Sequence, residues 1–347
     1  MKHLFVGVLL AGSRLFFGHP TWAAEPAGAG GAAVPSARVV MVHDPEATQA
    51  YSVRPARVQA MVQRGLLQLT GKSTLPAAWL SLVSTQDIIG IKVYSSPGPN
   101  SGTRPAVAAA VVEGLLAAHV PPTHIVIWDQ KLVDLRLAGY LALGERYGVR
   151  VASSTDAGYD TNTFYEAALL GRLLVGDVEF GRKGEGVGRK SFVSRLVTQQ
   201  LTKIIHLTPL LNHNEAGVSG NLFGLASGCV DNFFRFERDR EHIDSAIPDI
   251  YALPVLGDRV VLNIVDALIC QYEGGERGLL HYSTMLNQLR FSTDPVALDV
   301  LSLQELDRQR QAGGFPASKL SLEMYRNATL IELGVSEVRN IKVETAP

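Results

Sequence analysis

The chain has 347 residues, of which 46% are apolar and 19% are charged. This composition indicates a globular protein, long enough for two domains or one large one, and it disfavours disorder. The formal net charge of −1, from 32 basic and 33 acidic residues, lacks the positive excess by which proteins hold nucleic acid or an anionic bilayer. We therefore expect a small-molecule ligand and no nucleic-acid partner.

The first residues have the pattern of a secretory signal. Lys2 precedes an apolar run at 4–11, and Thr21 and Ala23 are small residues at the two positions that a signal peptidase reads. The run is far shorter than the roughly 20 residues that cross a bilayer. We expect a signal peptide at 1–23, a flexible Ala/Gly/Pro-rich lead at 24–37, and a periplasmic or secreted mature protein without stable membrane insertion. An uncleaved membrane tether is the alternative.

Two cysteines, Cys229 and Cys270, are present in the whole sequence. Two thiols are too few for a four-cysteine iron–sulfur cluster or a structural zinc site built from this chain, so we expect no iron–sulfur cluster. In an oxidising compartment the pair could form a disulfide, and two free buried thiols are the equal alternative.

Short β-branched segments alternate with longer helical patterns along the rest of the chain. This alternation predicts an α/β fold made of βαβ units, with a mainly parallel or mixed sheet flanked by helices. We expect one α/β domain over 38–347, either as a single body or as two lobes at 38–155 and 195–347 with a glycine-rich loop region at 156–194. The expected strands are 38–42, 88–94, 124–129, 149–152, 203–207 and 259–265, and the expected helices are 54–69, 105–118 and 295–306.

Two helix starts carry recognisable signals. Pro105 suits the first turn of a helix, with Thr103 as a cap just before it, and Asp294 precedes the helical pattern that starts at Pro295. We expect Asp294 to be a helix cap rather than a catalytic acid.

Five segments resemble, in this order, the domain of unknown function 362 family: DIIGIKVYSSPGPNSGTRPAVAAAVVEGLL, HIVIWDQ, PLLNHNEAGVSGNLFGLASG, VVLNIVDALICQYEGG and FSTDPVALD. The resemblance spans Arg38 to the C-terminus and implies no established activity. Some relatives carry additional iron–sulfur modules, which this chain lacks. Asn212, Phe223 and Gly224 stand where the family loop has a lysine and a Lys-Asn pair, so this chain is a divergent member.

His213 is the first candidate site residue, since it follows a proline in a polar loop between a strand and a glycine-rich turn. Imidazole there suits an acid/base group or a metal ligand, and a histidine that orients the loop is the alternative. Around it, backbone and amide groups are candidates for ligand binding: Asn212, Asn214, Gly217, Ser219 and Gly220. His206, inside the preceding strand, is expected to be a satisfied interior histidine.

Asp129 and Asp266 each end a β-branched strand, which in a parallel sheet places a carboxylate at the edge where ligands bind. With His213 they are suitable ligands for a divalent metal, and helix capping or loop anchoring is the alternative. Lys92, at the end of another strand, either stabilises an anion or forms an interior salt bridge with one of these aspartates.

From these residues we expect an exported enzyme acting on a small polar or anionic substrate, with possible assistance from a divalent metal. His213, Lys92 and Asp266 are its candidate catalytic residues. The alternatives are a periplasmic ligand-binding protein without turnover and a protein-interaction protein.

Overall fold

The computed structural model describes residues 35–237, 240–318 and 321–346. The predicted signal peptide and most of the predicted lead lie outside the described residues. From Pro35 onward the chain forms one compact unit.

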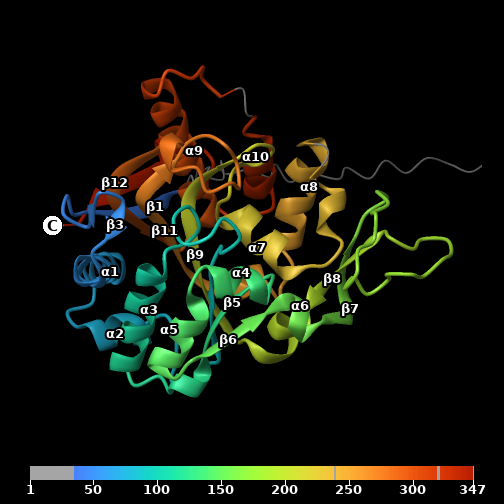
Figure 1. The fold of residues 1–347 in the computed structure, drawn as a ribbon, viewed down its shortest axis with the longest axis horizontal. Coiled ribbons are helices and arrows are strands. Elements are labelled where there is room, and N and C mark those ends of the chain that lie inside the picture. The colour runs from blue at the N-terminus through green and yellow to red at the C-terminus, as the bar shows by residue number, and fades with distance from the viewer. Residues whose placement is uncertain (1–34, 238–239, 319–320, 347) are drawn as a thin grey trace, which may run out of the picture. The chain divides into compact units, whose positions relative to one another are not determined.

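One large sheet forms the centre of this unit, with the strand order β13-β1-β12-β11-β9-β4-β5-β6 and with β10 paired beside β9 (Figure 1). Along that path β12 runs antiparallel to both neighbours, and the other neighbouring strands are parallel. The predicted α/β class with a mainly parallel or mixed sheet is therefore confirmed. The strands are β1 (Ala37–His43), β4 (Ile89–Lys92), β5 (Ile125–Asp129), β6 (Arg150–Ser153), β9 (Lys203–His213), β10 (Gly217–Val218), β11 (Val260–Gln271), β12 (Ser283–Ser292) and β13 (Ile341–Thr345).

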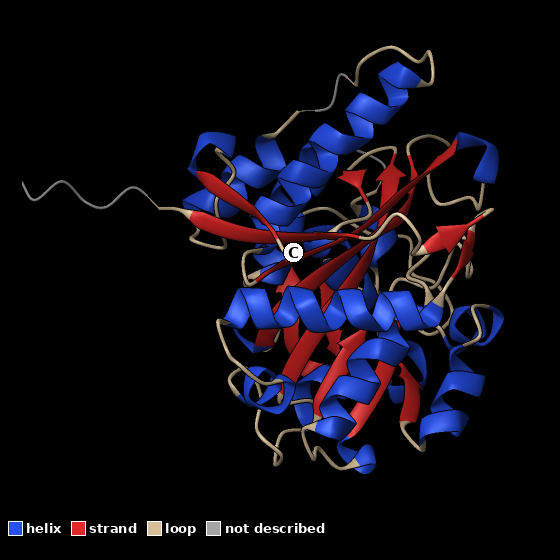
Figure 2. Cartoon of the chain, turned by 90° about the vertical axis from the view of Figure 1, so that its left-hand side faces the viewer, coloured by secondary structure: helices blue, strands red, loops and turns tan. Residues whose placement is uncertain are grey.

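Helices cover both faces of the sheet (Figure 2). One face packs against α1 (Pro55–Thr70), α2 (Leu75–Leu80), α3 (Pro105–Ala117), α4 (Leu132–Leu137) and α5 (Tyr140–Tyr147). The other packs against α7 (Asn221–Cys229), α8 (Arg240–Tyr251), α9 (Pro295–Ala312) and α10 (Glu323–Leu330). Because successive residues of a strand point to opposite faces, each central strand contributes to both cores.

The smaller elements lie outside this sheet. They are α6 (Ser154–Ala157) and two short antiparallel pairs, β2 (Thr48–Gln49) with β3 (Ser52–Val53) and β7 (Tyr159–Glu166) with β8 (Lys190–Ser194). The long loop 167–189 connects β7 to β8 and extends away from them (Figure 1).

Strand order reverses between β4 and β9. From β4 the chain adds β5 and then β6 on one side, and it returns to place β9 and then β11 on the other side of β4. In open α/β sheets the carboxyl ends of the strands at such a reversal form the usual ligand-binding crevice. This point of the fold is therefore the first place to look for a site.

The two predicted helix caps have different outcomes. The Asp294 side chain accepts a 2.8 Å hydrogen bond from the Ala297 amide at the start of α9, which confirms that cap. The Thr103 cap is wrong, because Arg104 is the N-cap residue of α3 and makes no side-chain cap bond. Thr103 Oγ1 instead donates to the Leu207 carbonyl at 2.7 Å and joins the loop after β4 to β9.

Two central strands are longer than their sequence patterns indicate. Strand β9 continues through Pro209 to His213, and β11 continues through Asp266 to Gln271. Pro209 lies opposite Asp266, and the register shifts just after this pair, so the ladder tolerates a residue without an N–H group. His213 is therefore a strand residue rather than a loop residue, and Asp266 lies inside a strand rather than at its end.

Among the described residues, no helix has both the length and the apolar character required to cross a bilayer.

Candidate functional site

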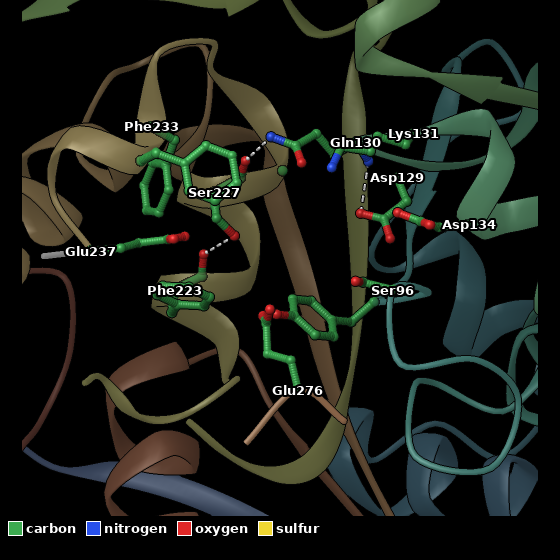
Figure 3. A pocket seen from close by; sticks show the side chains of 13 residues that line it. Ser96, Asp129, Gln130, Lys131, Asp134, Phe223, Ser227, Phe233, Glu237 and Glu276 are labelled. Atoms are coloured by element: carbon green, nitrogen blue, oxygen red, sulfur yellow. Dashed lines mark hydrogen bonds between the residues drawn. The ribbon is translucent and has the colours of Figure 1, made fainter. Parts of the chain in front are cut away.

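A cavity of about 80 Å³ lies at the carboxyl ends of β4 and β5, beside the point where the strand order reverses (Figure 3). Tyr94 and Ser96 follow β4, and residues 129–131 close β5. The opposite wall comes from α7 and the segment after it. The residues that line the cavity are Tyr94, Ser96, Asp129, Gln130, Lys131, Asp134, Phe223, Ser227, Gly228, Phe233, Phe234, Glu237 and Glu276.

A buried ion pair forms the base of this cavity. Lys92 Nζ donates to Asp129 Oδ1 and to the Val93 carbonyl, both at 2.8 Å. The other Asp129 oxygen accepts from the Ser95 amide at 2.7 Å and from its hydroxyl at 2.6 Å. Lys92 is fully buried and Asp129 nearly so. Of the two alternatives for Lys92, the structure contains the interior salt bridge.

The residues packed around Lys92 explain how a lysine side chain fits in this buried position. Its ammonium lies 5.6 Å from the Trp128 ring centre and 5.9 Å from that of Tyr94, within the range of cation–π attraction. On the helix side α7 presents Gly228, whose missing side chain leaves room for the lysine stem. A larger residue at 228 would displace the ammonium.

Three carboxylates that line the cavity have no hydrogen bond or ion pair with any described residue: Asp134, Glu237 and Glu276. Burial raises the pKa of Asp134 and of Glu237, although the nearby Lys131 ammonium opposes the shift for both groups. With Asp129, four carboxylates face one lining ammonium. The cavity therefore has an acidic lining in which carboxylates outnumber the ammonium groups.

Aromatic rings form the wall opposite β5. Phe223 and Phe233 meet edge to face with ring centres 5.7 Å apart. Figure 3 shows both rings beside Ser227, whose carbonyl accepts from the Gln130 side chain at 3.0 Å. This bond joins α7 to the end of β5, so the two walls of the cavity are fixed to each other.

His213 faces a different cavity. Its Nδ1 atom accepts from the amides of Glu215 and Ala216 at 3.3 and 3.0 Å, and its ring packs on Phe223 with centres 4.2 Å apart. Burial lowers the pKa of His213 to about 4. The ring is therefore neutral near pH 7 and carries its proton on Nε2. A cavity of about 690 Å³ lies before it, lined also by Asn212, Asn214 and Gly217.

Asp266 is buried in an ion pair with Arg104. Its Oδ1 atom lies 2.9 Å from Arg104 Nη1, and its Oδ2 accepts from the Arg104 amide at 2.9 Å. Asp129 is held by Lys92 and His213 by backbone amides, so the structure gives each of the three expected metal ligands separate partners. In the described part of the chain, no group of three or more His, Cys, Asp or Glu residues is arranged to hold a metal ion.

The glycine-rich turn before α7 has its own internal anion. The Asp299 carboxylate of α9 accepts from the amides of Asn221 and Leu222 at 2.7 and 3.0 Å. The Ser219 amide donates to the Leu211 carbonyl at 2.9 Å, and a side chain at Gly220 would collide with Asp299. Ser219 and Gly220 therefore shape the packing of α7 against α9, and the helix N-terminus binds Asp299 rather than an external anion.

His206 is an interior histidine, as expected, but it is not satisfied. It is fully buried, and neither ring nitrogen has a hydrogen-bond partner. Burial and the nearby Lys92 ammonium both lower its pKa well below the usual value. Cys229 and Cys270 are both buried and free, which is the second alternative stated for them.

Sequence reasoning missed the carboxylates of the first cavity. Glu237 and Glu276 lie in irregular segments after α7 and β11, and Asp134 lies in the short helix α4. No motif or spacing links these positions. The one available signal was that Glu237 and Glu276 follow the family-like segments PLLNHNEAGVSGNLFGLASG and VVLNIVDALICQYEGG in the sequence.

The chain is an α/β protein with a mixed sheet, and the cavity of Figure 3 lies at the carboxyl edge of the parallel part of that sheet. More specifically, the chain belongs to the family described as Domain of unknown function (DUF362), whose sequence model matches residues 89–304, more than half of the chain. The match begins at β4, so β1, α1 and β13 lie outside it.

One solved structure, a protein from Thermotoga maritima, aligns with a TM-score of 0.42 and 10% sequence identity. The alignment covers 77% of this chain and 61% of that protein, so the chain spans about three fifths of its length. No curated protein matches the sequence.

Proposed function

We propose that this chain is an exported enzyme that acts on a small polar molecule and binds its positively charged or donor-rich end in the cavity of Figure 3. One observation carries the proposal: the carboxylates of Asp134, Glu237 and Glu276 line a cavity at the strand-order reversal and have no hydrogen bond or ion pair with any described residue. A carboxylate without a bonded partner in a partly buried site gains most from a cationic group.

The shape of the cavity supports the same ligand class. Its volume of about 80 Å³ admits a head group rather than a whole substrate. Tyr94, Phe223 and Phe233 supply aromatic surface beside the carboxylates, the combination that attracts ammonium groups. The expected substrate was a small polar or anionic molecule. The lining favours a polar molecule with a cationic group over an anionic one.

The chemistry available is proton transfer. Glu237 has a raised pKa and the Lys131 ammonium nearby, which suits a general acid or base operating closer to neutral pH than an ordinary carboxyl group. Lys92 and Asp129 would fix the base of the site without reacting. Assistance by a divalent metal remains a prediction, since no group of three or more His, Cys, Asp or Glu among the described residues is arranged to hold a metal ion.

The second candidate is a binding protein without turnover, since carboxylates and aromatic rings are sufficient to retain an amine. Substrate conversion would distinguish the two candidates. Both require binding, so binding is tested first.

The test is a titration of the protein with n-butylamine, n-butanol and butyrate, followed by NMR. We expect saturable binding of butylamine, followed through the signals of the residues that line the cavity of Figure 3, and at least tenfold weaker binding of the other two at those residues. Glu237→Gln should weaken the binding of butylamine, whereas Glu185→Gln, in the exposed loop 167–189, should not. Preferential binding of butyrate at those residues, or an unchanged amine affinity in Glu237→Gln, would sink the proposal.

A further inference from the structure

The largest cavity described above, in front of His213, shares no lining residue with the acidic cavity of Figure 3. It is enclosed by the end of β9, the start of α8, the second half of α9 and residues 316–318. Its volume of about 690 Å³ lies within the range of small-molecule sites. We propose that it is a second binding site, for a carboxylate with an aliphatic body.

His213 supplies the hydrogen-bond donor of this site. The side chain is 8% exposed, and two backbone amides occupy its Nδ1 atom. Its proton is therefore on Nε2, which has no hydrogen-bond partner among the described residues and is not enclosed by protein atoms. A buried histidine held in one tautomer, with the N–H left over at a cavity, suits an acceptor on a ligand.

The carboxylates of the lining already have partners. Glu273 is paired with Arg310, and both carboxylate oxygens of Asp307 accept hydrogen bonds from Ser318 and Gln311. The Nε atoms of Arg240 and Arg310 have no hydrogen-bond partner but are enclosed by protein atoms, and Arg240 Nε lies 3.8 Å from the Asp244 carboxylate. The His213 Nε2–H is thus the donor left for a ligand that brings an oxygen atom.

The opposite wall is aliphatic. Leu303 and Leu306 of α9 and Leu322 face the same cavity, together with Pro316 and Ala317. A fully polar ion would leave this surface in water, whereas an alkyl chain would cover it. The two walls together therefore select an amphiphilic carboxylate rather than a free inorganic anion.

The test is calorimetric titration of the full chain with hexanoate, hexanol and hexylamine. We expect one saturable hexanoate site, with at least tenfold weaker binding of the alcohol. Hexylamine is titrated with the Glu237→Gln variant, in which the proposed amine site is weakened, and should also bind at least tenfold more weakly than hexanoate. His213→Phe should weaken the affinity for hexanoate about 10- to 100-fold, which is the effect of removing one hydrogen bond to a charged group. His43→Phe, on β1 and away from the cavity, should have no effect.

Equal binding of hexanol and hexanoate, no saturable binding, or an unchanged affinity in a folded His213→Phe variant would each overturn the proposal. If His213→Phe does not fold, Leu303→Trp replaces it, because an indole at 303 fills the cavity and should abolish hexanoate binding. Glu237→Gln should leave hexanoate binding intact, so this site and the proposed amine site can fail separately.

Discussion

Gly228 of α7 lies directly against Lys92 of β4: a Cβ atom at position 228 would stand 2.4 Å from Lys92 Cε and 2.8 Å from Nζ. Because Gly228 has no side chain, α7 packs directly on Lys92, and Gly228 also lines the acidic cavity. Residue 228 therefore connects the packing of α7 to the Lys92–Asp129 pair.

Gly228→Ala should lower the free energy of unfolding by roughly 1–3 kcal/mol, the usual effect of overpacking a buried site. Gly224→Ala is the matched control on the same helix, since a Cβ atom there would meet its nearest neighbour, His206, at 3.4 Å. Helix propensity favours alanine by up to about 1 kcal/mol, so the control should be neutral or stabilising. Urea unfolding measures both, and equal effects would contradict the assigned contact.

Lys92→Met should destabilise the protein by about 3–5 kcal/mol, because it leaves the buried Asp129 carboxylate without its counter-charge. Asp129→Asn should be similarly damaging, since it isolates a fully buried ammonium. The double variant should lose much less free energy of unfolding than the sum of the losses in the two single variants. Chemical denaturation of all four proteins gives the coupling, and strictly additive losses would show that the pair does not act as a unit.

Asp299 should make stability depend on pH near neutrality. Burial raises its pKa to about 7, despite the amides of Asn221 and Leu222 that favour the carboxylate. Because its unfolded pKa is about 3.9, the folded state binds the extra proton between these values, and stability falls as pH rises from about 4 to 7, by up to about 1.4 kcal/mol per unit.

Asp299→Asn should remove this contribution and so expose the opposite slope that His213 gives between about pH 4 and 6.5, whereas Asp258→Asn, at an exposed position, should leave the pH dependence unchanged. Thermal or urea unfolding at a series of pH values measures the difference. Identical slopes in the wild type and Asp299→Asn would remove Asp299 as the cause.

His213 should titrate near pH 4 and remain neutral at pH 5.5, with its proton on Nε2. Since an unfolded histidine has a pKa of about 6.5, this group makes stability decrease as pH falls from 6.5 toward 4, by up to about 1.4 kcal/mol per unit. Imidazole nitrogen shifts in NMR report both the tautomer and the midpoint. A midpoint near 6.5 would show that the ring is not desolvated.

The sheet strands that the sequence predicted are those with uninterrupted β-branched runs, such as β4 and β5. Strand β12 was missed because its polar residues, including Asn287 and Gln288, weaken the apolar pattern. The ends of β9 and β11 were missed because Pro209 and Asp266 are usually strand breakers, and only the neighbouring strand shows that the ladder continues past them.

The sequence placed some residues of the candidate site correctly and others not, for a related reason. Asp129 could be placed at the sheet edge from its position after a strand. The partners of Asp266 and of the α7 N-terminus, Arg104 and Asp299, are 162 and 78 residues away. No local pattern encodes such pairings, so residues that looked available for a ligand are already bound within the protein.

Within the described part of the chain, strand β1 pairs only with β12 and β13, which begin at Ser283 and Ile341. During synthesis, the earliest strand of the sheet therefore has no partner until almost the whole chain has been made. Such distant pairing slows folding and leaves an apolar strand edge exposed meanwhile. A nascent or transported chain would need that edge protected, which makes β1 the segment where a chaperone would matter most.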